Sequence, residues 1–477
     1  MGADPFDHMM NKIKVLALSI SAVFTVFAGG EFKAGFSRVD ITPPTGGSIP
    51  GYFRKRIADG VLDPLVVECV AFSWKSETGL VFAVDNIHVG EKLLLKANAV
   101  IERELGIPAS RQFINSTHTH TGGETQVRTH HTPEEAAKAR AYAKQLVAGI
   151  VASAKAACAD LAPSSLAVGS TQCRGVSFIR RFRMKDGSAR TNPKSGDKNI
   201  VEPLGESDES LQLLRIKRTG APDIAIINFG THPDTVGGTR ISADWPAFVR
   251  STFENGIGGG VKCLMLNGAQ GDVNHRDRNP AAGRKKLPKV KVREYMGRRI
   301  AGAAMGIWDI CEDVEAGPVK GGIDRMKVPV KMPSEDEKKW IALFDAGRKD
   351  EIPLGRMEIL TLTKPYSFAR RFKNGPKFLE MPVSALSIGK SIAFAGFPGE
   401  PFVKIALDVK AASPFRMTMA ACLVNGACGY LPSTDAFAQG GYEVLSSRFD
   451  KSVGDRLVET QLKLLNRLYG ENDTVRE

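Results

Sequence analysis

Two of the eight histidines, His118 and His120, stand two residues apart, just before a glycine turn at Gly122 and Gly123. Residues 111–114 are predicted to form a short strand ahead of them. Because side chains two apart on a strand point to the same face, we expect both imidazoles in one cleft. Such a cleft suits a metal ligand beside a second catalytic group. Solvated histidines at a polar strand end are the alternative.

A third histidine and a carboxylate lie at comparable points of the chain. His232 follows a predicted strand over 225–229, and Glu400 lies between a predicted strand over 392–397 and a helix beginning at Pro401. Proline suits the first helical position, and a helix N-terminus favours a negative charge. Functional residues of α/β folds collect at strand ends. Each residue alone could instead be a hydrogen-bonding turn residue or a helix-capping acid.

Tyr430 and Tyr442 lie twelve residues apart, and each is flanked by glycine. Aromatic packing at a turn would explain either one. Together with the histidines and Glu400, they complete a set of nitrogen and oxygen donors of the kind that zinc binds, with one position left for water. Zinc lowers the pKa of such a water to about 7, which gives a hydroxide able to attack a carbonyl. The residues therefore predict a hydrolytic metal site.

Apolar strands alternate with amphipathic helices along the chain, which predicts an α/β class domain of mixed β-sheets covered by α-helices. The predicted strands are 36–41, 66–74, 80–89, 166–170, 211–217, 225–229, 261–266 and 392–397. The predicted helices are 92–104, 133–161, 245–255, 292–308, 401–411 and 449–466. There is no linker, repeat or low-complexity tract, so residues 31–477 are expected to form a single large domain.

The N-terminal residues resemble a targeting segment. Residues 1–9 look like a vector-derived leader, and residues 10–30 carry two lysines, an apolar run and a small-residue exit. These are the parts of a signal peptide. The apolar run is too short for a confident transmembrane helix. We therefore expect a secreted or periplasmic protein.

Charge and cysteine content limit the function classes. The net charge is +13, and the excess is concentrated in the basic stretch 284–293. A solvated face would explain this stretch, and contact with anionic lipid or acidic polysaccharide is the alternative. Nucleic acid is not an expected partner, because no aromatic residues interleave the basic ones. Seven scattered cysteines without a CxxC pair argue against a thiolate zinc site and a disulfide framework, but leave room for one or two disulfides.

Nine short motifs occur in order across most of the chain: VDITPP (39–44), GYF (51–53), DPL (63–65), THTH (117–120), HP (232–233), GDVN (271–274), GEPF (399–402), GY (429–430) and GYE (441–443). In these motifs the chain resembles the neutral/alkaline ceramidases, zinc amidases that split ceramide into sphingosine and fatty acid. The HTH element and the tyrosines twelve residues apart are the most specific of them.

The resemblance implies one zinc ion per chain, with four ligands: His118, His232, Glu400 and Tyr430. It implies that His120 exchanges a proton with the reacting amide or its leaving amine.

It also implies that Tyr442 and an arginine stabilise the developing oxyanion. Arg180 fits the family position best, and the adjacent Arg181 is the alternative.

The chain differs from the well-known ceramidases in length. Those proteins end in an immunoglobulin-like domain, whereas this chain stops soon after Tyr442 and a closing helix, so we expect the catalytic domain without that module.

The segments 121–126 and 274–279 are polar, which favours a cleft for short or single acyl chains. The expected partner is a small N-acyl substrate, such as ceramide, another N-acyl lipid or an acylated amino sugar. The alternatives are an esterase or carbohydrate deacetylase with the same site, and a non-catalytic binding protein. Nothing in the sequence fixes the oligomeric state.

Overall fold

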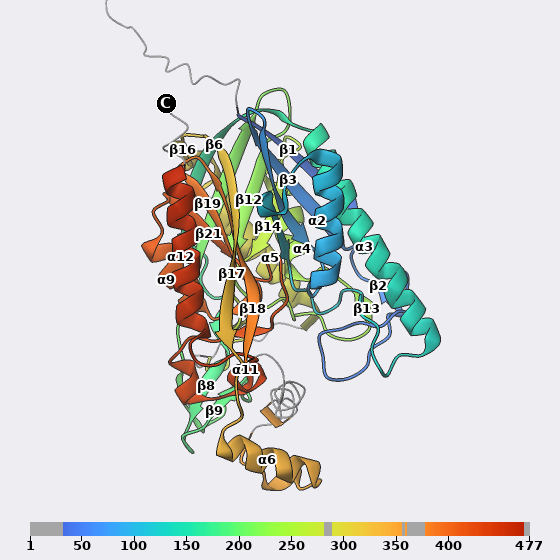
Figure 1. Ribbon diagram of the computed structural model, residues 1–477, viewed down its shortest axis with the longest axis vertical. Helices are drawn as coiled ribbons and strands as arrows, with labels where there is room; N and C mark the ends of the chain where they lie inside the picture. Colours follow the sequence, from blue (N-terminus) through green and yellow to red (C-terminus); the bar gives the residue numbers. More distant parts are fainter. Residues whose placement is uncertain (1–31, 281–288, 355–357, 360–376, 472–477) are drawn as a thin grey trace, which may run out of the picture.

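The computed structural model describes residues 32–280, 289–354, 358–359 and 377–471 (Figure 1). The predicted leader (1–9), the predicted signal peptide (10–30) and the first half of the basic stretch, residues 284–288, lie outside the described residues. Within the described ranges, none of the helices has the length and apolar character needed to cross a membrane.

The larger sheet has nine strands, with the order β14-β12-β11-β6-β1-β3-β4-β5 and β16 beside β6. Its strands are β1 (Phe32–Asp40), β3 (Val66–Trp74), β4 (Glu77–Val84), β5 (Gln112–Ser116), β6 (Ala162–Gln172), β11 (Ser210–Arg218), β12 (Ile224–Phe229), β14 (Lys262–Asn267) and β16 (Glu312–Val314). Most neighbours are antiparallel, but β4 and β5 are parallel, as are β12 and β14. Parallel neighbours need a crossover, and a helix lies in each of these connections.

The second sheet contains β17 (Val319–Pro329), β18 (Phe378–Ile388), β19 (Ile392–Gly396) and β21 (Met417–Ala421), in that order. Sequence analysis predicted only β19 of these four. One face of each sheet contributes to a shared apolar core, so the two sheets pack face to face. Phe72 of the first sheet contacts Phe394 of the second, with ring centroids 6.1 Å apart.

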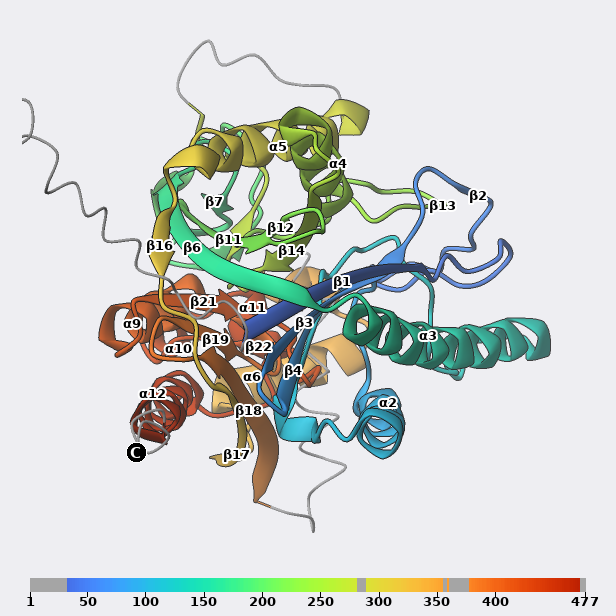
Figure 2. The same cartoon turned by 90° about the horizontal axis from the view of Figure 1, so that it is seen from above.

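Helices cover the outer faces of both sheets (Figures 1 and 2). On the larger sheet, α2 (Glu91–Leu105) and α3 (Pro133–Ala159) cover one half, and α4 (Trp245–Ile257) and α5 (Lys289–Met305) cover the other. On the second sheet lie α9 (Val403–Ala412) and α12 (Val453–Glu471). Strands buried on both faces are largely apolar along their length, as in β3 and β12. The predicted mixed α/β architecture is confirmed, with layers in the order helix, sheet, sheet, helix.

The remaining elements are short and lie around these layers. They are β2 (Gly60–Val61), β7 (Phe178–Ile179), β8 (Arg181–Met184), β9 (Ala189–Thr191), β10 (Ile200–Pro203), β13 (Arg240–Ile241), β15 (Val273–Asn274), β20 (Glu400–Pro401), β22 (Tyr430–Leu431), α6 (Glu335–Asp345), α10 (Ala436–Gln439), α11 (Tyr442–Ser446), and the 3₁₀ turns η1 (Ala109–Arg111), η2 (Trp308–Ile310) and η3 (Lys349–Glu351). All seven cysteines fall within the described residues, and none is bonded to another.

Candidate metal centre

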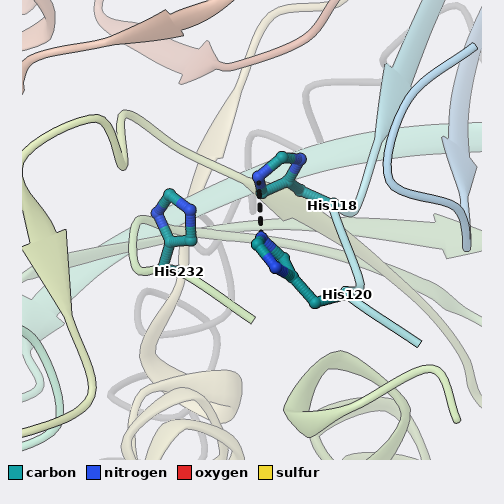
Figure 3. Close-up of side chains that lie close together, drawn as sticks. All are labelled: His118, His120 and His232. Carbon is teal, nitrogen blue, oxygen red and sulfur yellow. Dashed lines mark hydrogen bonds between the residues drawn. The ribbon is translucent and has the colours of Figure 1, made fainter. Parts of the chain in front are cut away.

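The candidate site lies where strands of both sheets end. His118 follows β5, His232 follows β12, and Glu400 follows β19. The sequence placed these residues at strand ends, and the structure brings them together across the sheet-to-sheet interface. Figure 3 shows the imidazoles of His118, His120 and His232 facing one another. Their ligand atoms all lie within 4.8 Å of one another, so the three histidines form a cluster that could hold a metal ion.

The reason for the pairing of His118 and His120 differs from the expected one. β5 ends at Ser116, so the two residues are not on a strand, and strand alternation does not align them. Instead His118 has a φ of 71°, in the left-handed region that non-glycine residues rarely adopt. This turn brings the two Nε2 atoms to 3.2 Å. Strained backbone of this kind is common at functional sites.

Hydrogen bonds assign the protons on two of the imidazoles. The Nδ1 of His118 lies 2.7 Å from the carbonyl oxygen of Ile87, and the Nδ1 of His232 lies 3.0 Å from that of Gln270. A carbonyl oxygen only accepts, so each Nδ1 carries the proton and donates. Each Nε2 therefore presents a lone pair to the centre of the site. Bonds of this type orient histidines that bind metals.

The carboxylate of Glu400 lies opposite these lone pairs. Its Oε2 is 3.4 Å from the Nε2 of His118 and 3.5 Å from the Nε2 of His232. This oxygen is buried without a hydrogen-bond partner. Ligands of a tetrahedral zinc, each about 2.0–2.2 Å from the ion, are separated by roughly 3.4 Å. Two lone pairs and a carboxylate oxygen at this spacing fit a single cation.

The electrostatics of the pocket suit a cation. Burial lowers the pKa of His232 well below its ordinary value, and burial with the neighbouring His118 lowers that of His120 to about 3. Burial would raise the pKa of Glu400, but His118, His232 and Arg180 hold it below its ordinary value. At neutral pH His232 is therefore neutral and Glu400 is ionised, as metal ligands must be.

Glu400 is held differently from the prediction. Helix α9 begins at Val403, so Glu400 is not at a helix N-terminus. It lies in β20, where it pairs directly with Tyr430 of β22. A Cβ on Gly271 would lie 2.5 Å from the backbone oxygen of Glu400, so only glycine fits there. The predicted helix 401–411 exists as α9, but it begins two residues later than predicted, because Glu400 and Pro401 pair with Tyr430 and Leu431, strand partners that leave no local pattern.

The two tyrosines lie together beside this pair. The rings of Tyr430 and Tyr442 are 5.4 Å apart in an edge-to-face arrangement. Burial raises the pKa of Tyr430 well above its ordinary value, and it raises that of Tyr442 to about 12. Both phenols are therefore protonated at neutral pH. Tyr430, through its pairing with Glu400, is the tyrosine next to the proposed ligands.

The adjacent arginines lie in different surroundings. The Nη1 of Arg180 is 3.4 Å from the Nδ1 of His232, and its guanidinium carbon lies 5.2 Å from the ring centroid of Tyr430. Arg181 instead donates to the side chain of Gln439 and the backbone of Gly440. Arg180 is thus the arginine that lies at the cluster.

Sequence reasoning assigned no role to Glu443. This fully buried carboxylate accepts hydrogen bonds of 2.7 Å from the Nε of Arg180 and from the hydroxyl of Thr191. It fixes the guanidinium against His232. The sequence signal that could have identified Glu443 is its position directly after Tyr442, in the motif GYE (441–443).

Asp234 and His275 were also missed. Their carboxylate oxygen and Nδ1 lie 3.0 Å apart, and the amide of Asn274 donates to Asp234 at 3.2 Å. The backbone N–H of His120 donates to the carbonyl of Pro233 at 3.2 Å, which ties this pair to the cluster. The polar segment 274–279 had suggested only a polar cleft wall.

Comparison with known proteins places this geometry in a known fold. No family model matches the chain, and no curated protein does. A neutral ceramidase from Pseudomonas aeruginosa is similar in structure, with a TM-score of 0.66 over 92% of this chain and 75% of that chain, at 17% identity. A ceramidase complexed with C2 gives a TM-score of 0.65 over 92% of this chain and 76% of that chain, at 16% identity. The predicted resemblance to the neutral ceramidases is confirmed at the level of the fold.

Proposed function

We propose that this chain is a zinc-dependent hydrolase that cleaves an N-acyl amide bond. One observation carries the proposal: the lone pairs of His118 and His232 and the unpartnered oxygen of Glu400 converge at 3.4–3.5 Å in a buried pocket. The ceramidase-like fold supports the same class of chemistry.

Zinc is the proposed ion because the donors are imidazole nitrogens and a carboxylate oxygen, with Tyr430 as a fourth ligand from the strand next to Glu400. When bound, zinc polarises a carbonyl oxygen and makes water nucleophilic near neutral pH. Catalytic zinc sites typically have three protein ligands and one open position for water or substrate. With Tyr430 as a fourth protein ligand, water or substrate would bind by expanding the coordination from four to five.

The side chains around the ligands are proposed to act on the substrate. His120 is proposed to move a proton through its Nε2, which lies beside that of His118. Tyr442 and Arg180 are proposed to stabilise the negative charge that develops on the carbonyl oxygen. In support, Tyr442 lies against Tyr430, and Arg180 lies against both Tyr430 and His232.

The proposed substrate is a small N-acyl compound, either a lipid such as ceramide or an acylated amino compound. One similar protein is a ceramidase complexed with C2, which supports a small-molecule ligand here. Two exposed aromatic rings flank the site: Tyr52 lies 5.4 Å from the ring of His120, and Phe53 lies 6.3 Å from that of Tyr442. Exposed rings at a cleft suit an apolar acyl group.

Metal analysis and a paired panel of N-acyl and O-acyl substrates test the proposal. We expect one zinc per chain and faster turnover of the amides. Faster turnover of esters or acetylated sugars would favour the esterase or deacetylase. A metal-loaded protein that binds these compounds without turnover would be a binding protein.

We also propose that the chain is exported, on the basis of the signal-like segment 10–30. Expression from Met10 should place the protein outside the cytoplasm and shorten it near residue 30. A protein of unchanged mass that stays in the cytoplasmic fraction would refute export without affecting the proposed chemistry.

A further inference from the structure

A groove with a volume of about 670 Å³ lies between helices α2 and α3, which run side by side in both views (Figures 1 and 2). Its volume is in the range of small-molecule sites. The floor is apolar and includes Leu93 and Val100 of α2 and Val147 and Val151 of α3. All four side chains are only half-buried, so the groove is open to solvent.

The rim of the groove is strongly cationic. Lys96, Arg140, Lys144 and Lys155 line it, and none of its described lining residues is acidic. Lys155 forms an ion pair with Glu104. Within the described part of the chain, the other three have no ion-pair partner. An apolar floor beneath unpaired cations complements a ligand that has an apolar body and a negative end.

We propose that this groove binds a single-chain fatty carboxylate. The chain would lie along Val147 and Val151, and the carboxylate would lie beside Arg140 and Lys144, which are one helical turn apart. At 1.5 Å per residue, the stripe from Arg140 to Lys155 is about 22 Å long, which gives room for an extended acyl chain. Burial of each methylene favours binding about fourfold.

A dissolved fatty carboxylate fits this surface better than a bilayer does. Contact with a bilayer needs apolar side chains that protrude, whereas the apolar lining here is recessed between two helices. Among the exposed large hydrophobic residues of the described ranges, only Leu95 lies on α2 or α3. The surface therefore suits a chain laid into the groove.

Calorimetry with octanoate, decanoate and neutral decanol, below their aggregation concentrations, tests the proposal. The protein carries His118→Ala, so that turnover does not interfere and the result does not depend on the proposed activity. We expect one saturable site, tighter binding of decanoate than octanoate by about fourfold per methylene, and weaker binding of decanol. Absence of a saturable site, or equal binding of decanol and decanoate, would overturn the proposal.

Matched variants locate the site. Ala148→Glu places a carboxylate in the groove and should weaken decanoate binding at least tenfold, whereas Ala156→Glu on the same helix lies outside the lining and should not. Lys144→Glu should weaken binding of decanoate but not of decanol, and Lys92→Glu, outside the lining on α2, should change neither. Equal effects within either pair would place the binding elsewhere. Unchanged thermal melting confirms that the variants fold.

Other occupants give different results, each of which contradicts the proposal. If a second copy covers it, Ala148→Glu will change the sedimentation mass. If the groove contacts a membrane, Ala148→Glu will abolish binding to anionic phospholipid vesicles in a protein that does not bind decanoate.

Discussion

The guanidinium of Arg56 donates a hydrogen bond of 2.6 Å to the backbone carbonyl oxygen of His120. The same guanidinium donates to the carbonyls of Pro50 and Gly238, and it lies 4.3 Å from the ring centroid of Tyr52. Burial lowers the pKa of Arg56 to about 10. A buried cation thus joins three loops at the cluster and fixes the backbone of His120.

Replacement of Arg56 by Ala should lower kcat by roughly 10²-fold, because small displacements of catalytic groups cost rate on this scale. Zinc content should change little, since the hydrogen bonds of Arg56 go to the carbonyls of Pro50, His120 and Gly238 and not to a proposed ligand. Arg56→Lys should restore only part of the rate, because the lysine ammonium lacks the planar set of N–H donors of the guanidinium. Steady-state kinetics with metal analysis measures this, with Arg54→Ala, an exposed neighbour, as the control. A loss confined to KM would instead make Arg56 a substrate-binding residue.

Replacement of His118 or His232 by Ala should abolish both metal content and turnover. Each imidazole donates from Nδ1 to a backbone carbonyl and directs its Nε2 to the centre, so its loss removes a ligand that no neighbour replaces. Elemental analysis of purified protein, with His130→Ala as an exposed histidine control, gives the answer. Full zinc content in both variants would show that the ion binds elsewhere.

His120→Ala and Tyr442→Phe should keep the metal and lose most of the rate. Removal of one oxyanion donor typically costs about 10²–10³ in turnover. The measurement is turnover per bound zinc. His120 also lies within the histidine cluster, so its variant is the sharper test. If His120→Ala loses the ion as well, His120 is a ligand and the proposed proton transfer needs another residue.

Glu443→Ala should destabilise the fold by about 3–5 kcal/mol, because Arg180 would become a buried charge without its partner. Chemical denaturation measures the change in the free energy of unfolding. Glu202 forms an exposed pair with Arg183 at 2.8 Å, and Glu202→Ala should cost at most about 1 kcal/mol. An equal loss of unfolding free energy in the two variants would mean that the buried Arg180–Glu443 pair contributes no more to stability than the exposed pair.

The substrate prediction concerns chain length. Single-chain or short N-acyl compounds should be hydrolysed at least as well as long-chain ceramide, since a groove for two long tails needs many apolar residues near the site. A chain-length series at fixed detergent concentration measures kcat/KM. If efficiency climbs steadily to long-chain ceramide while short and sugar-linked amides stay inert, the cleft is lipid-selective.

The local sequence was enough to locate the strand ends that carry the cluster. Apolar runs before His118, His232 and Glu400 predicted three buried strands, and all three exist as β5, β12 and β19. Their meeting in space was not readable from periodicity, because it depends on how the two sheets pack.

What the sequence missed depends on distant partners. The segment of β17 contains two glycines and several charges, yet it forms eleven paired positions with β18. Glu400 belongs to β20 only because Tyr430 lies beside it. The φ of His118 and the ion pair of Glu443 likewise result from tertiary contacts. None of these leaves a local signature.

The packing of the two sheets has a consequence for the order of assembly. Near the cluster, the backbone N–H of Ile114 donates to the side chain of Asn425 across 311 residues of sequence. Contacts so distant along the chain form slowly and late in folding. A half-synthesised chain can complete β5 and β12 but has no Glu400 to close the pocket. Acquisition of the proposed ion would therefore be a late event, and a firmly held metal would report that the segments on both sides of the pocket have reached their final positions.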